Sequence, residues 1–139
     1  THTYANIQRD RCFAINFLSI NYYDQLIHTI HQNDFETDEF AAGKFMLSDA
    51  KTIHAPVIEE AFINMECTLK DAQDLSGAGL TSMVIGQVQH VSVEEKYAYG
   101  DSERYGNNGF MMLVPAPQNL VTGAPGRSAI STVNIQKYD

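Results

Sequence analysis

Apolar and polar residues alternate along two stretches of the chain, which predicts a pair of β-strands. Residues 61–69 carry an apolar side chain at every second position from Ile63 to Leu69. Residues 83–93 are longer and mix apolar and polar side chains on both faces, and strict alternation places Val88 and His90 on the same face. A period of two is that of a strand. A Ser-Gly-Ala-Gly turn at residues 76–79 separates the stretches, and Gly86 predicts a bulge or a close backbone approach.

The chain before residue 60 combines one short strand with helical segments. Thr1 or Thr3 can cap a helix over the first ten residues, and the apolar run at residues 12–18 predicts a buried strand interrupted by Asn16. Apolar positions in residues 21–32 recur three and four apart, which predicts an amphipathic helix with Asn21 as its cap. A helical turn at residues 38–40 should end at Gly43, followed by an extended connector at residues 54–56.

The last forty residues are rich in Gly, Asn, Pro and Ser. A turn at residues 106–109 and a short strand at residues 110–114 are predicted, and from about residue 100 we expect an extended C-terminal segment. The 139 residues are too few for two independent cores, so we expect a single domain over residues 1–139. The patterns together indicate a mainly β fold with short helices, of the α+β class.

Charge and composition narrow the possible partners. The formal net charge is -8 with only 9 Lys and Arg residues, so no broad basic face is expected and nucleic acid is not an expected partner. No apolar run approaches the roughly 20 residues of a membrane span, so no membrane partner is expected either. Cys12 and Cys67 lie in apolar runs, which predicts unpaired core thiols and a cytoplasmic protein.

Common catalytic motifs are missing from the chain. It carries no P-loop, no Gly-x-Gly-x-x-Gly and no Gly-x-Ser-x-Gly nucleophile elbow. His28 and His31 have a helical ligand spacing, and His54, His90 and Glu66 could be added to them, but no carboxylate is tied to the pair by spacing. We therefore expect no metal site, and surface histidines are the simpler interpretation.

Six segments share their order and spacing with one known family: Thr1–Ile7, Phe13–Ser19, Asp38–Gly43, Ala55–Ala61, Met65–Cys67 and Ile85–Val91. In these segments the chain resembles the flavin reductase-like family, which has a Thr-x-x-x-Ile helix that leads into a Phe-Ala-Val-Asn-Leu strand, an Asp-Glu-Phe turn, an Ala-Pro segment, a Leu-Glu-Cys strand and an Ile-Gly-x-Val strand. The resemblance covers residues 1–93, and it implies that the family's first strands are absent from this sequence.

This resemblance implies a Greek-key split β-barrel that binds FMN, or in some members FAD, at the interface of a homodimer. NADH or NADPH would be the co-substrate, and a small molecule would be the electron acceptor. Family position puts Thr1, His2 and Thr3 beside the FMN phosphate. It puts His90 near the nicotinamide, although a histidine on the sheet surface is equally expected. By the same resemblance, the isoalloxazine ring would lie alongside Ala14, Ile15, Asn16, Phe17 and Leu18.

The residues alone leave simpler interpretations open. Thr1 to Thr3 read as an ordinary helix cap, and Asn16 as a strand residue that bonds to its neighbours. Three hypotheses therefore stand: an NAD(P)H:flavin oxidoreductase, a flavin-binding electron carrier without nicotinamide turnover, and a flavin-free dimeric scaffold. In the first two, the cofactor would carry the chemistry and the protein would supply position and electrostatics.

Overall fold

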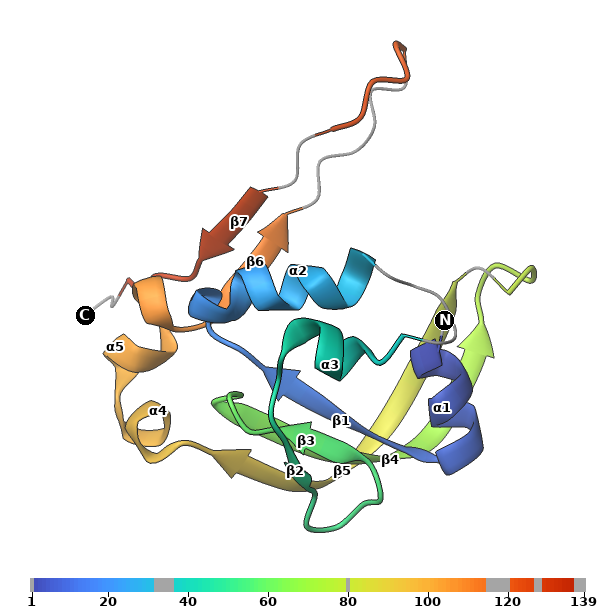
Figure 1. Ribbon diagram of the computed structural model, residues 1–139, viewed down its shortest axis with the longest axis horizontal. Coiled ribbons are helices and arrows are strands. Elements are labelled where there is room, and N and C mark those ends of the chain that lie inside the picture. Colours follow the sequence, from blue (N-terminus) through green and yellow to red (C-terminus); the bar gives the residue numbers. More distant parts are fainter. Residues whose placement is uncertain (1, 32–36, 80, 115–120, 127–128, 137–139) are drawn as a thin grey trace.

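A three-stranded antiparallel sheet forms the centre of the computed structural model, which describes residues 2–31, 37–79, 81–114, 121–126 and 129–136. Its strands are β1 (Cys12–Phe17), β4 (Ile63–Asp74) and β5 (Ser82–Val93), in the order β1-β4-β5 (Figure 1). Two hairpins complete the strands: β2 (Leu47–Asp49) with β3 (Pro56–Ile58), and β6 (Met111–Val114) with β7 (Ala129–Thr132). The β6–β7 hairpin projects from the body of the molecule.

Short helices surround this sheet. They are α1 (His2–Asp10), α2 (Tyr23–His31), α3 (Glu39–Gly43), α4 (Glu95–Tyr99) and α5 (Asp101–Arg104), and α2 and α3 lie side by side in Figure 1. Asp38 caps α3, because its side chain accepts hydrogen bonds from the N–H groups of Phe40 and Ala41. Lys44 ends that helix in the left-handed conformation, one residue after the predicted terminator Gly43.

The entry into α2 differs from its prediction. Residues Ile20–Tyr22 form a 3-10 turn, for which Ser19 occupies the N-cap position. Asn21 lies inside this turn, and its side chain donates a hydrogen bond to Asn108 Oδ1 over 3.3 Å. The prediction that Asn21 caps the helix was therefore wrong, because the chain begins to coil before that residue. The helical turns α4 and α5 were not predicted at all, since their sequences are too short to show a period.

The core consists of two neighbouring apolar clusters. Leu18, Phe45, Ile58 and Ala61 form the first, with Tyr22, Leu26, Phe40 and Met111 packed against it. The second lies at the start of β4, where the ring of Phe62 stacks on Tyr97 at 4.3 Å and meets Phe110 edge-on at 5.0 Å. Phe62 is only 2% exposed. These aromatic contacts hold α4 and the base of β6 against the sheet.

The pairing register gives the sheet two different faces. Asn16 pairs with Asn64 and Glu66 pairs with His90, which defines a polar face that we call the cavity face; its central members are Ala14, Asn16, Asn64, Glu66, His90 and Ser92. Ile15 pairs with Met65 and Met65 with Val91 on the opposite side, which we call the open face; its central members are Ile15, Met65, Val88, Val91 and Val93.

A bulge in β5 corrects the predicted faces of this strand. Val88 pairs with Cys67, whereas His90 pairs with Glu66, and the register shifts between the two pairs. Neighbouring residues of β4 point to opposite faces, so Val88 and His90 do too, because the extra residue Gln89 breaks the alternation. The close approach predicted at Gly86 is confirmed, since the ring of Phe13 packs against the backbone there. A Cβ atom added to Gly86 would lie 2.5 Å from Phe13 Cζ.

Candidate functional site

A cavity of about 370 Å³ lies between α1, β1, the start of α3 and the loop that joins β2 to β3. We call it the α1–β1 cavity. Its lining is mostly polar at the helix and mixed along the strand. The lining includes His2, Thr3, Asn6, Ala14, Asn16, His54, Ala55 and Pro56.

The first turns of α1 supply hydrogen-bond donors to this cavity. His2, Thr3 and Asn6 all line it, and the first turn of the helix contains no acidic residue. The first N–H groups of a helix have no partners within the helix and carry a partial positive charge, which favours an anion. His2 Nδ1 lies 4.0 Å from Glu39 Oε1 and so links the start of α1 to the start of α3.

The strand side of the cavity is formed by Ala14 and Asn16 of β1. Asn16 Oδ1 accepts a hydrogen bond from the N–H group of Ile58 over 3.1 Å, which ties β1 to β3. This contact does not use the NH₂ group of Asn16, which is a further donor at the cavity. The local interpretation of Asn16 and the ligand interpretation are therefore compatible, because each uses a different end of the amide.

Four of the nine predicted site residues meet at this cavity: His2, Thr3, Ala14 and Asn16. Thr1 lies outside the described residues. Three others do not line the cavity. Strand alternation places Ile15 on the open face, where it is 41% exposed, whereas Phe17 packs edge-on against Phe110 and Leu18 belongs to the core. A flavin contact for them stays a prediction.

His90 does not line the α1–β1 cavity. It lies on β5, where its Nε2 is 3.1 Å from Ser92 Oγ and its strand partner is Glu66. A nicotinamide contact for His90 likewise stays a prediction.

Sequence reasoning missed the role of Glu66, which it considered only as a possible metal ligand. This side chain is 2% exposed, yet no cationic side chain forms an ion pair with it in the described part of the chain. Its carboxylate accepts hydrogen bonds from the N–H groups of Lys51 and Thr52 and from Thr52 Oγ1, at 2.9, 2.7 and 2.6 Å. The sequence did carry a signal for this role, namely a glutamate inside a strand predicted to be buried. A buried charge requires hydrogen-bond donors, so donors from elsewhere in the chain had to be expected.

The pKa of Glu66 reflects these contacts. Burial acts to raise it, but the hydrogen bonds from Thr52 and from the two backbone N–H groups, together with the nearby imidazole of His90, outweigh burial. The pKa therefore lies below the ordinary value for a glutamate, and the side chain is a carboxylate at neutral pH. The loop that it holds is also the wall of the cavity.

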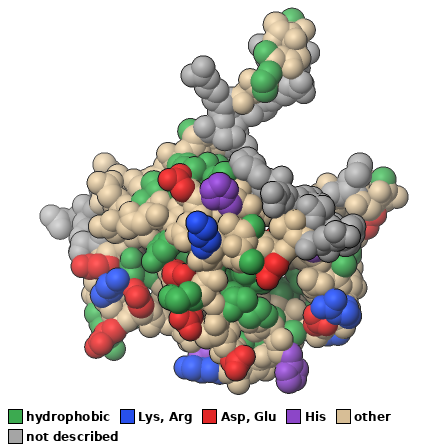
Figure 2. Space-filling view, viewed as in Figure 1, with side chains coloured by type: hydrophobic (Ala, Val, Ile, Leu, Met, Phe, Trp, Pro, Cys, Tyr) green, Lys and Arg blue, Asp and Glu red, His purple; other side chains and the backbone are tan. Residues whose placement is uncertain are grey.

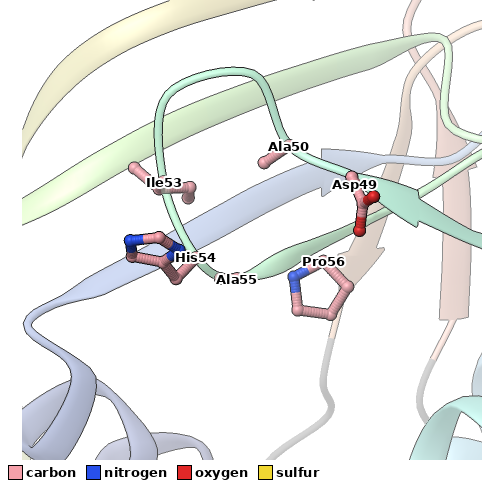
Figure 3. A pocket seen from close by; sticks show the side chains of 6 residues that line it. All are labelled: Asp49, Ala50, Ile53, His54, Ala55 and Pro56. Atoms are coloured by element: carbon pink, nitrogen blue, oxygen red, sulfur yellow. The ribbon is translucent and has the colours of Figure 1, made fainter.

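That loop, residues 50–55, encloses a second cavity of about 400 Å³ between Asp49 and Pro56. Figure 3 shows Ile53 and His54 on one limb of the loop and Asp49 at the end of the other. His54, Ala55 and Pro56 line both cavities, so they form the partition between them.

The α1–β1 cavity offers hydrogen-bond donors with which a ligand can be bound. No three His, Cys, Asp or Glu side chains gather as a metal site would require, among the residues that the structure describes. Figure 2 shows Lys and Arg side chains interspersed with Asp and Glu over the visible face. Arg9, which lines the cavity, is paired with Asp10. A phosphate here would need local donors. The hydroxyl, the amides and the helix N–H groups provide such donors, which fits a flavin phosphate and the polar edge of a flavin ring.

The chain is similar to several known proteins. The chain is 29% identical, over 94 residues, to an uncharacterized protein of Methanothermobacter thermautotrophicus, and this match covers 67% of the chain and 44% of that protein. A split-barrel protein of Shewanella frigidimarina NCIMB 400 that has been assigned as a flavin reductase matches with a TM-score of 0.64 and 27% identity, over 72% of this chain and 50% of the other. The chain thus spans about half the length of these two relatives.

Flavoredoxin of Desulfovibrio vulgaris (Miyazaki F) matches over the whole chain and 68% of its own, with a TM-score of 0.69. At 18% identity this likeness concerns the fold alone. These structures confirm the predicted class of fold, sheets with short helices in a split barrel. None of the helices within the described residues is long and apolar enough to cross a membrane. The model of the flavin reductase like domain matches residues 1–109, and the chain therefore belongs to the flavin reductase-like family.

Proposed function

We propose that the α1–β1 cavity holds the phosphate end of FMN and that the protein is an NAD(P)H:flavin oxidoreductase. The observation that carries this proposal is the meeting of the start of α1 with Ala14 and Asn16 of β1 at one cavity. FMN is the cofactor proposed on the resemblance to the family, and FAD is the alternative. When bound, the flavin supplies hydride transfer between the nicotinamide and an acceptor.

The residues of the chain position the cofactor in this proposal. The Thr3 hydroxyl and the first N–H groups of α1 donate to the phosphate oxygens, where the helix dipole adds a favourable charge. The NH₂ group of Asn16 donates to an acceptor on the polar edge of the ring. Ala14, which has the smallest side chain on this strand, lets a flat ring approach the backbone.

A homodimer in the cytoplasm is part of the proposal. The open face exposes apolar side chains at its centre, with Ile15, Val88, Val91 and Val93 between 41% and 44% exposed, which is typical of a surface that a partner covers. A second copy of the chain is the proposed partner. Both described cysteines, Cys12 and Cys67, are buried and unpaired, as in proteins of reducing compartments.

Titration of the purified protein with FMN, followed by flavin fluorescence, tests the proposal. We expect saturable binding that Thr3→Val weakens about tenfold, because a hydrogen bond to a charged phosphate is lost. Thr68→Val is the matched control, since Thr68 lies on β4, does not line the cavity, and its hydroxyl accepts a hydrogen bond from Gln89. Absence of binding by the unaltered protein overturns the proposal. Oxidation of NADH or NADPH on addition of FMN then separates an oxidoreductase from an electron carrier.

A further inference from the structure

The loop between β2 and β3 has no regular structure of its own. Its residues 51–55 are a series of bends, and its two ends are held by the pairing of Asp49 with Pro56. Between those ends, the hydrogen bonds from Lys51 and Thr52 to Glu66 are the contacts that fasten it to the central sheet. One buried carboxylate therefore fixes the middle of the loop.

This fastening is strong and directional. The shortest contact, 2.6 Å, joins Thr52 Oγ1 to Glu66 Oε2, and the N–H group of Thr52 reaches the same oxygen at 2.7 Å. Short hydrogen bonds to an ionised acceptor are roughly twice as strong as neutral ones. Both oxygens of Glu66 are used, so the carboxylate fixes the orientation of two successive peptide groups as well as their distance from the sheet.

The far side of the same loop faces the α1–β1 cavity. His54, Ala55 and Pro56 line that cavity only two to four residues after Thr52. Figure 3 shows the loop as a single arch, with Ala50 on one limb and His54 and Ala55 on the other. A displacement of Thr52 away from the sheet would thus move His54 in the wall of the cavity. Only Ile53 lies between the two residues, and so short a segment has a limited reach.

We infer that Glu66 is a positioning residue for the cofactor: through Lys51 and Thr52 it sets the loop that walls the α1–β1 cavity, and so sets flavin affinity without touching the ligand. This inference rests on the proposed function of the cavity. It assigns a role to a buried group that the binding chemistry itself does not use.

Four variants test it. Thr52→Val removes the hydroxyl contact at an exposed residue, and Thr52→Ser keeps that contact. Glu66→Gln keeps the shape of the side chain but turns an NH₂ group toward donors of the loop. Thr68→Val makes the same chemical change as Thr52→Val, but at a β4 residue whose hydroxyl contacts Gln89 and not Glu66.

Two measurements are made on each protein. Hydrogen exchange of the Lys51 and Thr52 amides is followed without flavin, and the FMN dissociation constant is measured by fluorescence. We expect Thr52→Val to speed exchange and to raise the dissociation constant about fivefold, and Glu66→Gln to do so about tenfold or more. Thr52→Ser should restore values near those of the unaltered protein, and Thr68→Val should change neither.

The outcomes separate the inference from the proposed function. Faster exchange with an unchanged FMN affinity overturns the inference and leaves the proposed function standing. Equal loss of affinity in Thr68→Val and Thr52→Val also overturns it, because the effect would then be general destabilisation. If the unaltered protein does not bind FMN, the proposed function fails and the inference fails with it. Thr52→Val keeps the test valid even if Glu66→Gln does not fold.

Discussion

The two faces of the β1-β4-β5 sheet are opposite in character and in burial. The cavity face carries amide, carboxylate and imidazole side chains, yet Glu66 on it is 2% exposed. The open face carries aliphatic side chains, yet Val91 on it is 43% exposed. A one-sided antiparallel sheet in water usually buries its apolar face and exposes its polar one.

This reversal motivates the proposals made for the two faces. Polar groups are buried on the cavity face because the loop at residues 50–55 satisfies Glu66, and because β3 satisfies Asn16. Such groups are costly to bury without a partner, and we propose a binding site beside them. The aliphatic side chains of the open face would gain from being covered, and we propose a dimer interface there.

The largest expected effect comes from the covered end of the open face. Gly86→Ala places a Cβ atom 2.5 Å from Phe13 Cζ and 3.0 Å from Cys67 Cβ, so the ring or the strand must shift to make room for it. We expect the free energy of unfolding to fall by about 3 kcal/mol, as for other overpacked cores. Urea denaturation measures it. The double variant Gly86→Ala/Phe13→Leu should recover part of the loss, and no recovery would show that the ring is not the obstacle.

The centre of the open face should affect assembly. Val91→Lys adds a charge to a side chain that is 43% exposed in one copy, so the single chain should change in stability by less than about 0.5 kcal/mol. Dimer dissociation should become easier by about 2 kcal/mol, as at a buried interface residue. Sedimentation velocity over a concentration series measures the constant. An unaltered protein that stays monomeric, or a dimer indifferent to Val91→Lys, would contradict an interface here.

Two paired asparagines give a matched test of the cavity face. Asn16 Oδ1 accepts a hydrogen bond from the N–H group of Ile58. Asn64 lies opposite Asn16 on β4, and its Oδ1 is buried without a hydrogen-bond partner among the described residues. Asn16→Ala should lower the free energy of unfolding by about 1.5 kcal/mol, because the N–H group of Ile58 loses its acceptor. Asn64→Ala should cost about 0.5 kcal/mol or less, and equal losses would refute the tether. Thermal and urea unfolding of both variants decide the matter.

The smallest effect is one of pH on the cavity face. The pKa of Glu66 lies below its ordinary value, so its stabilising contribution is complete above about pH 4.3 and is lost as the pH falls through the folded-state pKa. The stability difference between the protein and Glu66→Gln should therefore shrink on acidification. Urea unfolding at pH 7 and at pH 3.5 measures it, with His90→Gln as a background that removes the imidazole. A difference that grows in acid would contradict the assigned direction.

Local patterns in the sequence were sufficient for the three strands of the central sheet, and they did not predict β2, β3 or β7. The period of two placed Met65 and Glu66 on opposite faces, and the apolar run at residues 12–18 became β1, because both depend only on neighbouring side chains. The family motifs directed attention to His2, Thr3, Ala14 and Asn16, which the fold brings to one cavity. Alternation also explains why Ile15, between Ala14 and Asn16, leaves that cavity.

What the sequence determined by itself was the three strands of the central sheet, the helices α1 to α3, the charge that excludes a broad basic surface, and the membership of a flavin reductase-like family. Only the tertiary structure decided that a bulge sends Val88 and His90 to opposite faces, and that Glu66 holds a loop fourteen residues before it in the chain. The reason is physical: periodicity reports on neighbours along one strand, whereas a bulge and a buried carboxylate depend on partners that meet only when the chain has folded.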